Sequence, residues 1–342
     1  GEAMEVFSVV FLDTRHRVIA YEPMFKGTID GATVYPRVLV KRAIEYNCSA
    51  VILAHNYQVS SVQDIADYTG DSLGLSLEAS RTDADLIVFC GVHFMAESAK
   101  VLSPDKRVFL PHLGAGCALA DAITVESLEE WKERYPEHTV VTYVNSTAEV
   151  KAESDICCTS ANAVSVVRSL ESDKVLFTPD KNLARWVAKQ VPEKEVIAYD
   201  GVCPTHDVLR NASVDRTRED YPEAIIIAHP ECREDVVDAA HEVCSTTGML
   251  DAVGRYPDAK TFIIATEEGM MHQLKLRYPE KEFVSADGCI GCRLHCPYMK
   301  VTGLQDIYFS LADERFEITL DDDVIEGARA ALERMMAVPR DH

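Results

Sequence analysis

The chain has 342 residues, of which 47% are hydrophobic and 26% charged, as is ordinary for a soluble globular protein of one large or several smaller domains. The formal net charge of −22 disfavours nucleic acid and acidic membrane surfaces as partners, and no apolar run approaches the roughly 18–20 residues that span a bilayer. Eleven cysteines without a recognisable signal peptide predict a reducing, cytoplasmic setting, where cysteines serve metals or catalysis more often than disulfides.

The first fifty residues predict a small separate segment. Residues 6–12 and 17–21 have the composition of strands, and the polar residues 13–16 predict a turn between them. Residues 36–47 predict a helix that begins near Pro36 and has apolar residues on one side. A short apolar strand, 51–54, follows and ends at His55.

From that strand onward an internal repeat governs the chain. Apolar strands at 51–54, 139–142 and 224–228 are each followed by polar residues, then a helix-like stretch, such as 62–68 or 234–243, and then a hydroxyl residue. The spacing from the first polar residue to the hydroxyl is 17 in every copy. The residues concerned are His55, Tyr57 and Ser72, then Tyr143, Asn145 and Ser160, and finally His229, Glu231 and Thr246.

Each copy has a second half of the same kind. It consists of a strand, a helix of ten residues, a proline-containing turn and another short strand. The predicted strands are 86–89 and 107–110, 175–177 and 195–199, and 262–265 and 282–284, with helices at 93–102, 181–190 and 268–277. Alternating short strands and helices predict parallel sheets covered by helices.

The sequence therefore predicts an α/β fold of three repeated αβα domains with short parallel sheets around a pseudo-threefold axis. The expected domains are 51–138, 139–222 and 223–300, preceded by an atypical segment, 1–50. Residues 301–342, with an amphipathic helix at 323–337, are expected to pack on the first domain.

The polar residues after the strands predict a ligand site, because ligands of parallel sheets bind beyond the carboxyl ends of the strands. Ser72, Ser160 and Thr246 are expected at helix N-termini, where free backbone N–H groups and the helix dipole hold anions. Plain N-capping is the alternative for any one of them, but the shared position in three copies favours anion binding for the set.

Cysteines recur with the repeat. The step from Cys117 to Cys203 is 86 residues, and 86 more reach Cys289. Three thiolates brought to one axis predict a metal ion or an iron–sulfur cluster. A local alternative is a structural zinc site at the end of the third repeat, made by Cys289, Cys292, His295 and Cys296.

Over about residues 51–342 the chain resembles the quinolinate synthase family. The matching motifs include Ala54-His55-Asn56-Tyr57-Gln58, Gly70-Asp71-Ser72, Gly91-Val92-His93-Phe94-Met95-Ala96-Glu97, Tyr143-Val144-Asn145, His229-Pro230-Glu231 and Cys296-Pro297-Tyr298-Met299. The resemblance implies three αβα domains that each give one cysteine to a [4Fe–4S] cluster. By motif these are Cys117, Cys203 and Cys296, so the resemblance replaces Cys289 of the repeat by Cys296.

The resemblance also implies an activity, the condensation of iminoaspartate with dihydroxyacetone phosphate to quinolinate in NAD biosynthesis. L-Aspartate oxidase would be the supplier of iminoaspartate. The residues carried over by motif are the catalytic His55, Tyr57, His229 and Glu231, and the substrate-binding Ser72, Tyr143, Asn145, Ser160, His206 and Thr246. An iron–sulfur or zinc-binding protein without this activity is the alternative, because the front of the chain departs from the family.

The N-terminal segment of the chain resembles another family. Residues 1–56 are similar to the beginning of a RadC-type JAMM domain, which continues with His-x-His and a downstream Ser-x-x-Asp to bind zinc. Here the second histidine is Tyr57, so the zinc site implied by that resemblance lacks a ligand. The two resemblances join at Ile52-Leu-Ala-His-Asn56, and residues 1–35 are expected to be dispensable for the chemistry.

Overall fold

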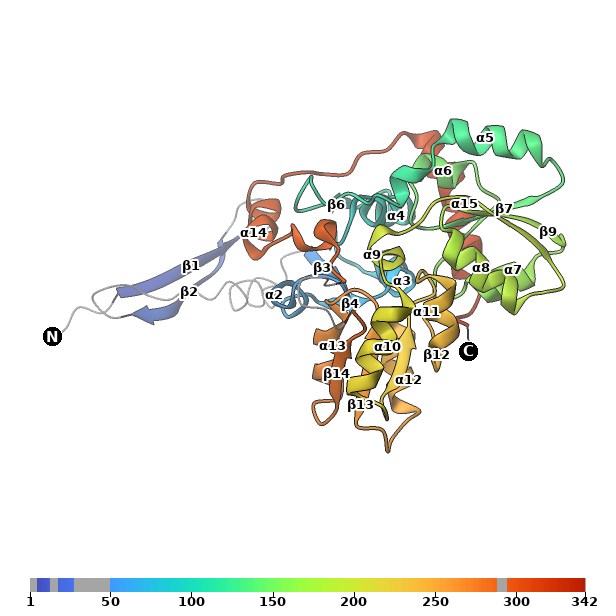
Figure 1. The fold of residues 1–342 in the computed structure, drawn as a ribbon. Coiled ribbons are helices and arrows are strands. Elements are labelled where there is room, and N and C mark those ends of the chain that lie inside the picture. Colours follow the sequence, from blue (N-terminus) through green and yellow to red (C-terminus); the bar gives the residue numbers. More distant parts are fainter. Residues whose placement is uncertain (1–4, 13–17, 28–49, 288–293, 342) are drawn as a thin grey trace.

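The computed structural model describes residues 5–12, 18–27, 50–287 and 294–341 (Figure 1). Strands β1 (Glu5–Leu12) and β2 (Val18–Gly27) pair in antiparallel fashion, as the sequence predicted for 6–12 and 17–21. The turn at 13–16 and the predicted helix at 36–47 fall outside the described residues.

The three predicted repeats are present, and each forms a four-stranded parallel sheet flanked by helices. The first repeat comprises β3 (Ala50–His55), α2 (Ser60–Gln63), β4 (Tyr68–Gly70), α3 (Ser72–Arg81), β5 (Leu86–Cys90), α4 (His93–Leu102) and β6 (Arg107–Phe109). The second comprises β7 (Thr139–Tyr143), α6 (Ala148–Ala152), β8 (Ile156–Cys158), α7 (Ala163–Ser169), β9 (Lys174–Thr178), α8 (Lys181–Gln190) and β10 (Glu195–Ala198). The third comprises β11 (Ile225–Ala228), α11 (Glu234–Ala239), β12 (Glu242–Val243), α12 (Thr246–Gly254), β13 (Thr261–Ala265), α13 (Met270–Arg277) and β14 (Glu282–Ser285).

The three sheets have the same topology. Their strand orders are β4-β3-β5-β6, β8-β7-β9-β10 and β12-β11-β13-β14, so the first and third strands of each repeat lie in the centre. The central strands are continuous apolar runs because both faces are covered by helices. The sequence missed the edge strands β4, β8 and β12, which span only two or three residues. The predicted helix 62–68 reached the first residue of β4, and the predicted helix 234–243 included all of β12.

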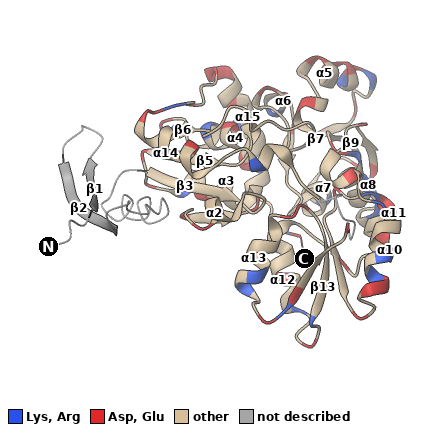
Figure 2. Cartoon of the chain, turned by 60° about the vertical axis from the view of Figure 1, so that its left-hand side comes forward, with Lys and Arg blue, Asp and Glu red and all other residues tan. Residues whose placement is uncertain are grey.

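Short elements connect the repeats. They are the 3₁₀ turn η1 (Ala120–Ala122), α5 (Val125–Arg134), α9 (Pro204–Asp207), α10 (Asn211–Asp220) and the 3₁₀ turn η2 (Pro297–Lys300). Charged residues are spread over outer helices such as α5, α10 and α11 (Figure 2). None of the helices in the described part of the chain combines the length and apolar character needed to cross a membrane.

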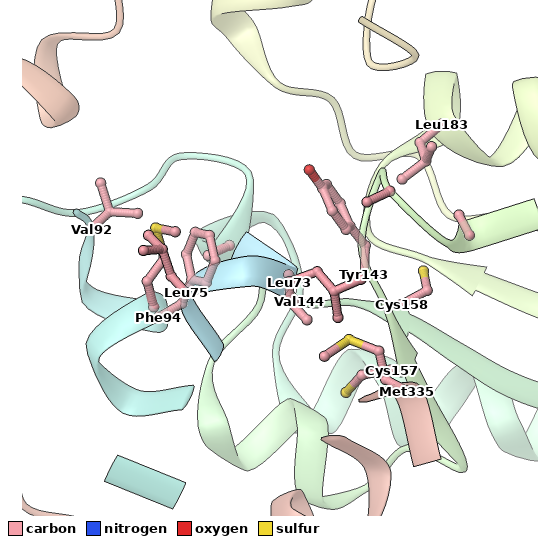
Figure 3. Packing of buried hydrophobic residues seen from close by; sticks show 14 of the residues in the cluster. Leu73, Leu75, Val92, Phe94, Tyr143, Val144, Cys157, Cys158, Leu183 and Met335 are labelled. Carbon is pink, nitrogen blue, oxygen red and sulfur yellow. The ribbon is translucent and has the colours of Figure 1, made fainter. Parts of the chain in front are cut away.

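The C-terminal segment holds α14 (Leu304–Ala312) and α15 (Asp322–Met336). Helix α14 contacts β5 of the first repeat, as expected for the whole segment. Helix α15 differs, because it contacts α6 and β8 of the second repeat as well as α4 of the first. Met335 of α15 lies beside Cys157 of β8 in the buried core (Figure 3). The segment therefore joins two repeats, whereas the sequence predicted packing on one.

Candidate active site

A single cavity receives the polar residues that follow the first strand of every repeat. Parallel strands direct their carboxyl ends to one edge of a sheet, and here three such edges meet. The cavity is lined by every site residue named from the sequence: His55, Tyr57, Ser72, Cys117, Tyr143, Asn145, Ser160, Cys203, His206, His229, Glu231, Thr246 and Cys296. The structure thus brings together all thirteen, although they span 242 residues of the chain (296 − 55 + 1).

Three thiols face this cavity, one from each repeat. Cys117, Cys203 and Cys296 are free and partly buried. Burial raises the pKa of Cys117 to about 12, and the nearby Cys296 adds to the increase. The pKa of Cys203 is also raised by burial, with contributions from Glu231 and Cys117. Thiols that are protonated when free and close to one another fit a soft metal centre, which binds thiolates and releases their protons. Cys289 and Cys292 lie outside the described residues, so the local zinc alternative stays a prediction.

A histidine–glutamate cluster lies next to the thiols. Glu231 Oε2 is 3.2 Å from His206 Nδ1 and 3.1 Å from His229 Nδ1, and all three residues are buried. Burial lowers the pKa of His206 to about 4, against the opposing effect of Glu231. For Glu231 burial acts to raise the pKa, but the two histidines and a hydrogen bond from Tyr143 bring it below the ordinary value. At neutral pH the cluster therefore combines the Glu231 carboxylate with the neutral imidazole of His206, which can accept a proton.

The first repeat contributes a phenol and an imidazole. The Tyr57 hydroxyl is 2.5 Å from Thr266 Oγ1, which is in turn 2.9 Å from His206 Nε2. Burial raises the pKa of Tyr57 well above its ordinary value and lowers the pKa of His55 to about 4. Tyr57 is therefore a proton donor at neutral pH, and His55 is a neutral acceptor.

The hydroxyl residues lie at helix beginnings but do not cap the helices. Asp71 caps α3 by accepting from the Gly74 amide at 2.8 Å, and Ser245 caps α12 by accepting from the Gly248 amide at 3.2 Å. Ser72 and Thr246 are the first residues of those two helices. Their hydroxyls line the cavity, so the plain N-capping alternative is wrong for these two residues. Ser160 precedes α7, and its hydroxyl is 3.1 Å from His229 Nε2.

Basic side chains do not supply an anion site in the cavity. None of the described residues that line it is lysine or arginine. An anion would therefore be held by hydroxyls, imidazoles and the backbone N–H groups of α3 and α12. Tyr143 adds a phenol, and its oxygen points away from the packed Cys157 and Met335 (Figure 3).

Sequence reasoning missed several residues around the cavity. Asp71 lines it and makes a bidentate ion pair with Arg340, at 2.5 and 2.9 Å. Thr266 and Glu267, just after β13, also contribute. The strand-end rule that selected His55 and His229 could have found Thr266 and Glu267, but only contacts between distant segments single out Arg340.

The fold and the cavity define the class of protein. It is an α/β protein of three repeats, which share one site that contains thiols and proton-transfer groups. The family described as Quinolinate synthetase A protein matches residues 40–337. The quinolinate synthase of Pelobacter propionicus is 53% identical over 293 residues, which are 86% of this chain and 95% of the relative. Those of Geotalea uraniireducens and Thermodesulfovibrio yellowstonii are 52% and 46% identical, over 86% of this chain and 94% and 96% of their own lengths. The chain belongs to the quinolinate synthase family.

The front of the chain has a second similarity. The family described as RadC-like JAB domain matches residues 1–64, so the two matches overlap over residues 40–64. The junction predicted at Ile52–Asn56 lies within this overlap. His55 and Tyr57 line the cavity together with residues of the quinolinate synthase repeats.

Proposed function

We infer that the protein condenses iminoaspartate with dihydroxyacetone phosphate to quinolinate. The atoms balance with release of one phosphate and two waters, and no oxidant or reductant is needed. The observation that carries this inference is the convergence of three cysteines and of proton-transfer groups from three repeats on one cavity. Dicarboxylate and phosphate substrates suit a site whose donors are hydroxyls and helix N-termini.

Cys117, Cys203 and Cys296 would hold a [4Fe–4S] cluster. When bound there, the cluster would supply Lewis-acid chemistry through one of its irons. The thiols fit this group, since they are free, face one cavity and come from three separate loops. The cysteines also favour a reducing, cytoplasmic setting, and L-aspartate oxidase is the supplier expected for iminoaspartate.

The chain's own side chains would transfer protons, bind the substrates and orient them. Glu231, His229, His55 and Tyr57 would move protons. A carboxylate and imidazoles can accept protons, and the phenol can donate one. Ser72, Ser160 and Thr246 would bind the phosphate and carboxylates. Tyr143, Asn145 and His206 would orient the substrates, since Asn145 Nδ2 donates to Glu231 Oε1 at 3.5 Å and His206 contacts Glu231.

The test is anaerobic reconstitution with iron and sulfide, followed by an absorption spectrum and a quinolinate assay. Single alanine variants of Cys117, Cys203 and Cys296 should each lose the cluster. The matched control is Cys244→Ala, because Cys244 is half-buried but is not among the residues that line the cavity. A cluster without product would indicate an electron-transfer protein. Bound zinc without visible absorption would indicate a zinc-binding protein, and either result would overturn the inference.

A further inference from the structure

Each repeat presents its two polar residues on a short loop after its first strand, and we name these loops by residues 55–58, 143–147 and 229–232. Inside the cavity the side chains of two loops contact each other, since Asn145 Nδ2 donates to Glu231 Oε1 at 3.5 Å. The backbone of each loop, or of the residue that directly follows it, is contacted by a different repeat. These contacts follow a cyclic order.

The first repeat contacts the loop of the second. Glu97 of α4 is buried, and its Oε2 accepts a hydrogen bond from the amide of Ala148 at 3.0 Å, where loop 143–147 enters α6. Its other oxygen lies 3.2 Å from His93 Nδ1. Lys151 of α6 completes the contact, since its Nζ donates to Ser146 O at 2.5 Å and lies 5.4 Å from the ring centroid of Phe94 in the first repeat.

The second repeat contacts the loop of the third. Asn182, near the beginning of α8, is buried, and its Nδ2 donates to the backbone oxygen of Glu231 at 3.1 Å. The same amide donates to Asp207 Oδ1 at 3.0 Å. Asn182 therefore fixes the backbone of Glu231 relative to the turn that carries His206.

The third repeat contacts the loop of the first. Lys300 Nζ donates to the backbone oxygen of Tyr57 and is 2.9 Å from Glu267. Gly269, just before α13, approaches Tyr57 so closely that an added Cβ would lie 2.7 Å from the Tyr57 carbonyl. Gln63 also donates to Gly269 O at 3.1 Å and to Gln58 O at 2.7 Å, so it ties the same loop to the third repeat.

The three contacts share an order and, in part, a location. Glu97 lies in α4, Asn182 lies in α8, and Glu267 and Gly269 precede α13, so each contact involves the segment after the third strand of its repeat. Lys300, which pairs with Glu267, comes from η2. Ordinary packing between repeats would not require buried or half-buried polar side chains that end on the backbone of a loop or of the residue directly after it. A hydrogen bond to a loop backbone fixes the loop without using the side chains that face the cavity.

We propose that each repeat positions the catalytic loop of the next in cyclic order, with Glu97, Asn182 and Lys300 as positioning residues. The roles of the loops rest on the proposed function. Displacement of a reacting group by about 1 Å costs on the order of a hundredfold in rate. Loss of one contact should therefore lower kcat more than it changes KM, and it should loosen one loop only.

The experiment compares Glu97→Ala, Glu97→Gln and Asn182→Ala in the full-length reconstituted protein. Glutamine retains an acceptor for the Ala148 amide, so Glu97→Gln should recover most of the activity that Glu97→Ala loses. We expect each alanine variant to lose about ten- to hundredfold in kcat. Amide hydrogen exchange should become faster at 143–147 in Glu97→Ala and at 229–232 in Asn182→Ala, each without the other.

Lys189→Ala is the matched control. Lys189 of α8 also joins the second repeat to the third, through Asp238 at 2.8 Å and Glu234 at 2.7 Å, but it is exposed and does not contact the loop. Loop loosening in Lys189→Ala equal to that in Asn182→Ala would overturn the proposal, as would unchanged exchange in both alanine variants. If Glu97→Ala does not fold, the comparison of hydrogen exchange in Asn182→Ala and Lys189→Ala tests the proposal. Wild-type protein without quinolinate formation would count against the proposed function, while the exchange pattern would still test the positioning.

Discussion

His206 and His229 stack with ring centroids 4.8 Å apart and 25° between the ring planes, and their Nδ1 atoms face the same oxygen of Glu231. The stack joins the turn after Cys203 to the first strand end of the third repeat. One carboxylate thus orients two imidazoles, and through His206 it reaches Cys203 Sγ, which is 3.2 Å from His206 Nδ1. Glu231 therefore contacts both a proton-transfer group, His229, and the histidine that lies beside the Cys203 thiol.

Replacement of Glu231 should therefore have a large effect. Glu231→Gln removes the negative charge and leaves a neutral amide between two imidazoles, so we expect kcat for quinolinate formation to fall by about 10²–10⁴-fold. Steady-state kinetics on reconstituted protein measures this decrease in kcat. Glu234→Gln, on the outer surface, is the control and should retain activity. Activity of Glu231→Gln within a few-fold of wild type would exclude Glu231 from the proton-transfer groups.

The ion pair between Asp71 and Arg340 should make stability depend on pH. Burial acts to raise the pKa of Asp71, but Arg340 and the Gly74 amide outweigh it and bring the pKa below its ordinary value. The stabilisation is therefore complete above about pH 4, the unfolded pKa of an aspartate, and is lost as the pH falls through the lower folded pKa.

Arg340→Gln tests this ion pair. Asp71 remains buried in the variant, so we expect a loss of about 1–3 kcal/mol in the free energy of unfolding at neutral pH. The loss should shrink below about pH 4, where the unpaired carboxyl becomes protonated. Urea unfolding at both pH values measures it, with Arg277→Gln, at a surface pair with Asp251, as control. An equal loss at both pH values would show that charge is not the cause.

Gly269 should not tolerate a side chain. In Gly269→Ala the new Cβ would meet the carbonyl of Tyr57 and Lys300 Nζ, both at 2.7 Å. Relief requires backbone movement, which costs about 1–3 kcal/mol and displaces Tyr57. Thermal unfolding and kcat together measure the effect. Gly70→Ala is the control, since its Cβ would meet only Leu75, at 3.9 Å. Normal stability and turnover of Gly269→Ala would show that the close approach is not required.

Deletion of residues 1–35 should leave cluster binding and turnover largely intact. Every described residue that lines the cavity lies at or after His55, and the quinolinate synthase match begins at residue 40. Anaerobic reconstitution and the quinolinate assay on the deletion variant check this prediction. A variant that folds and binds the cluster but makes no quinolinate would place part of the RadC-like segment in the active site.

The repeat made much of the fold predictable. The spacing of 17 residues and the recurring helices placed the central strands, and α4 and α8 begin and end where the sequence predicted. The second strand of each repeat, β4, β8 or β12, was missed because two or three residues give no periodicity. Capping by Ser72 stayed open as an alternative because the hydroxyl rule cannot distinguish Ser72 from Asp71, one residue earlier, which is the cap of α3.

Some residues of the site could be predicted from local sequence patterns and others could not, for a physical reason. His55, Tyr143 and His229 follow strands, so the local pattern places them. His206 came only from family resemblance, because it lies in a connecting turn. Repeat spacing alone selected Cys289, whereas the resemblance selected Cys296, and the structure places Cys296 in the cavity. Asp71 and Arg340 are 269 residues apart and meet only through folding, so no local pattern reveals their pairing.

The common topology of the three sheets has a chemical consequence. A ring of three identical subunits must present the same side chain three times around its axis. Covalent linkage of the repeats removes that restriction. At corresponding positions this chain carries a phenol in Tyr57, an amide in Asn145 and a carboxylate in Glu231. A scaffold with near-equivalent thirds can therefore surround an asymmetric substrate with three different functional groups, each of which can change by mutation without altering the other two.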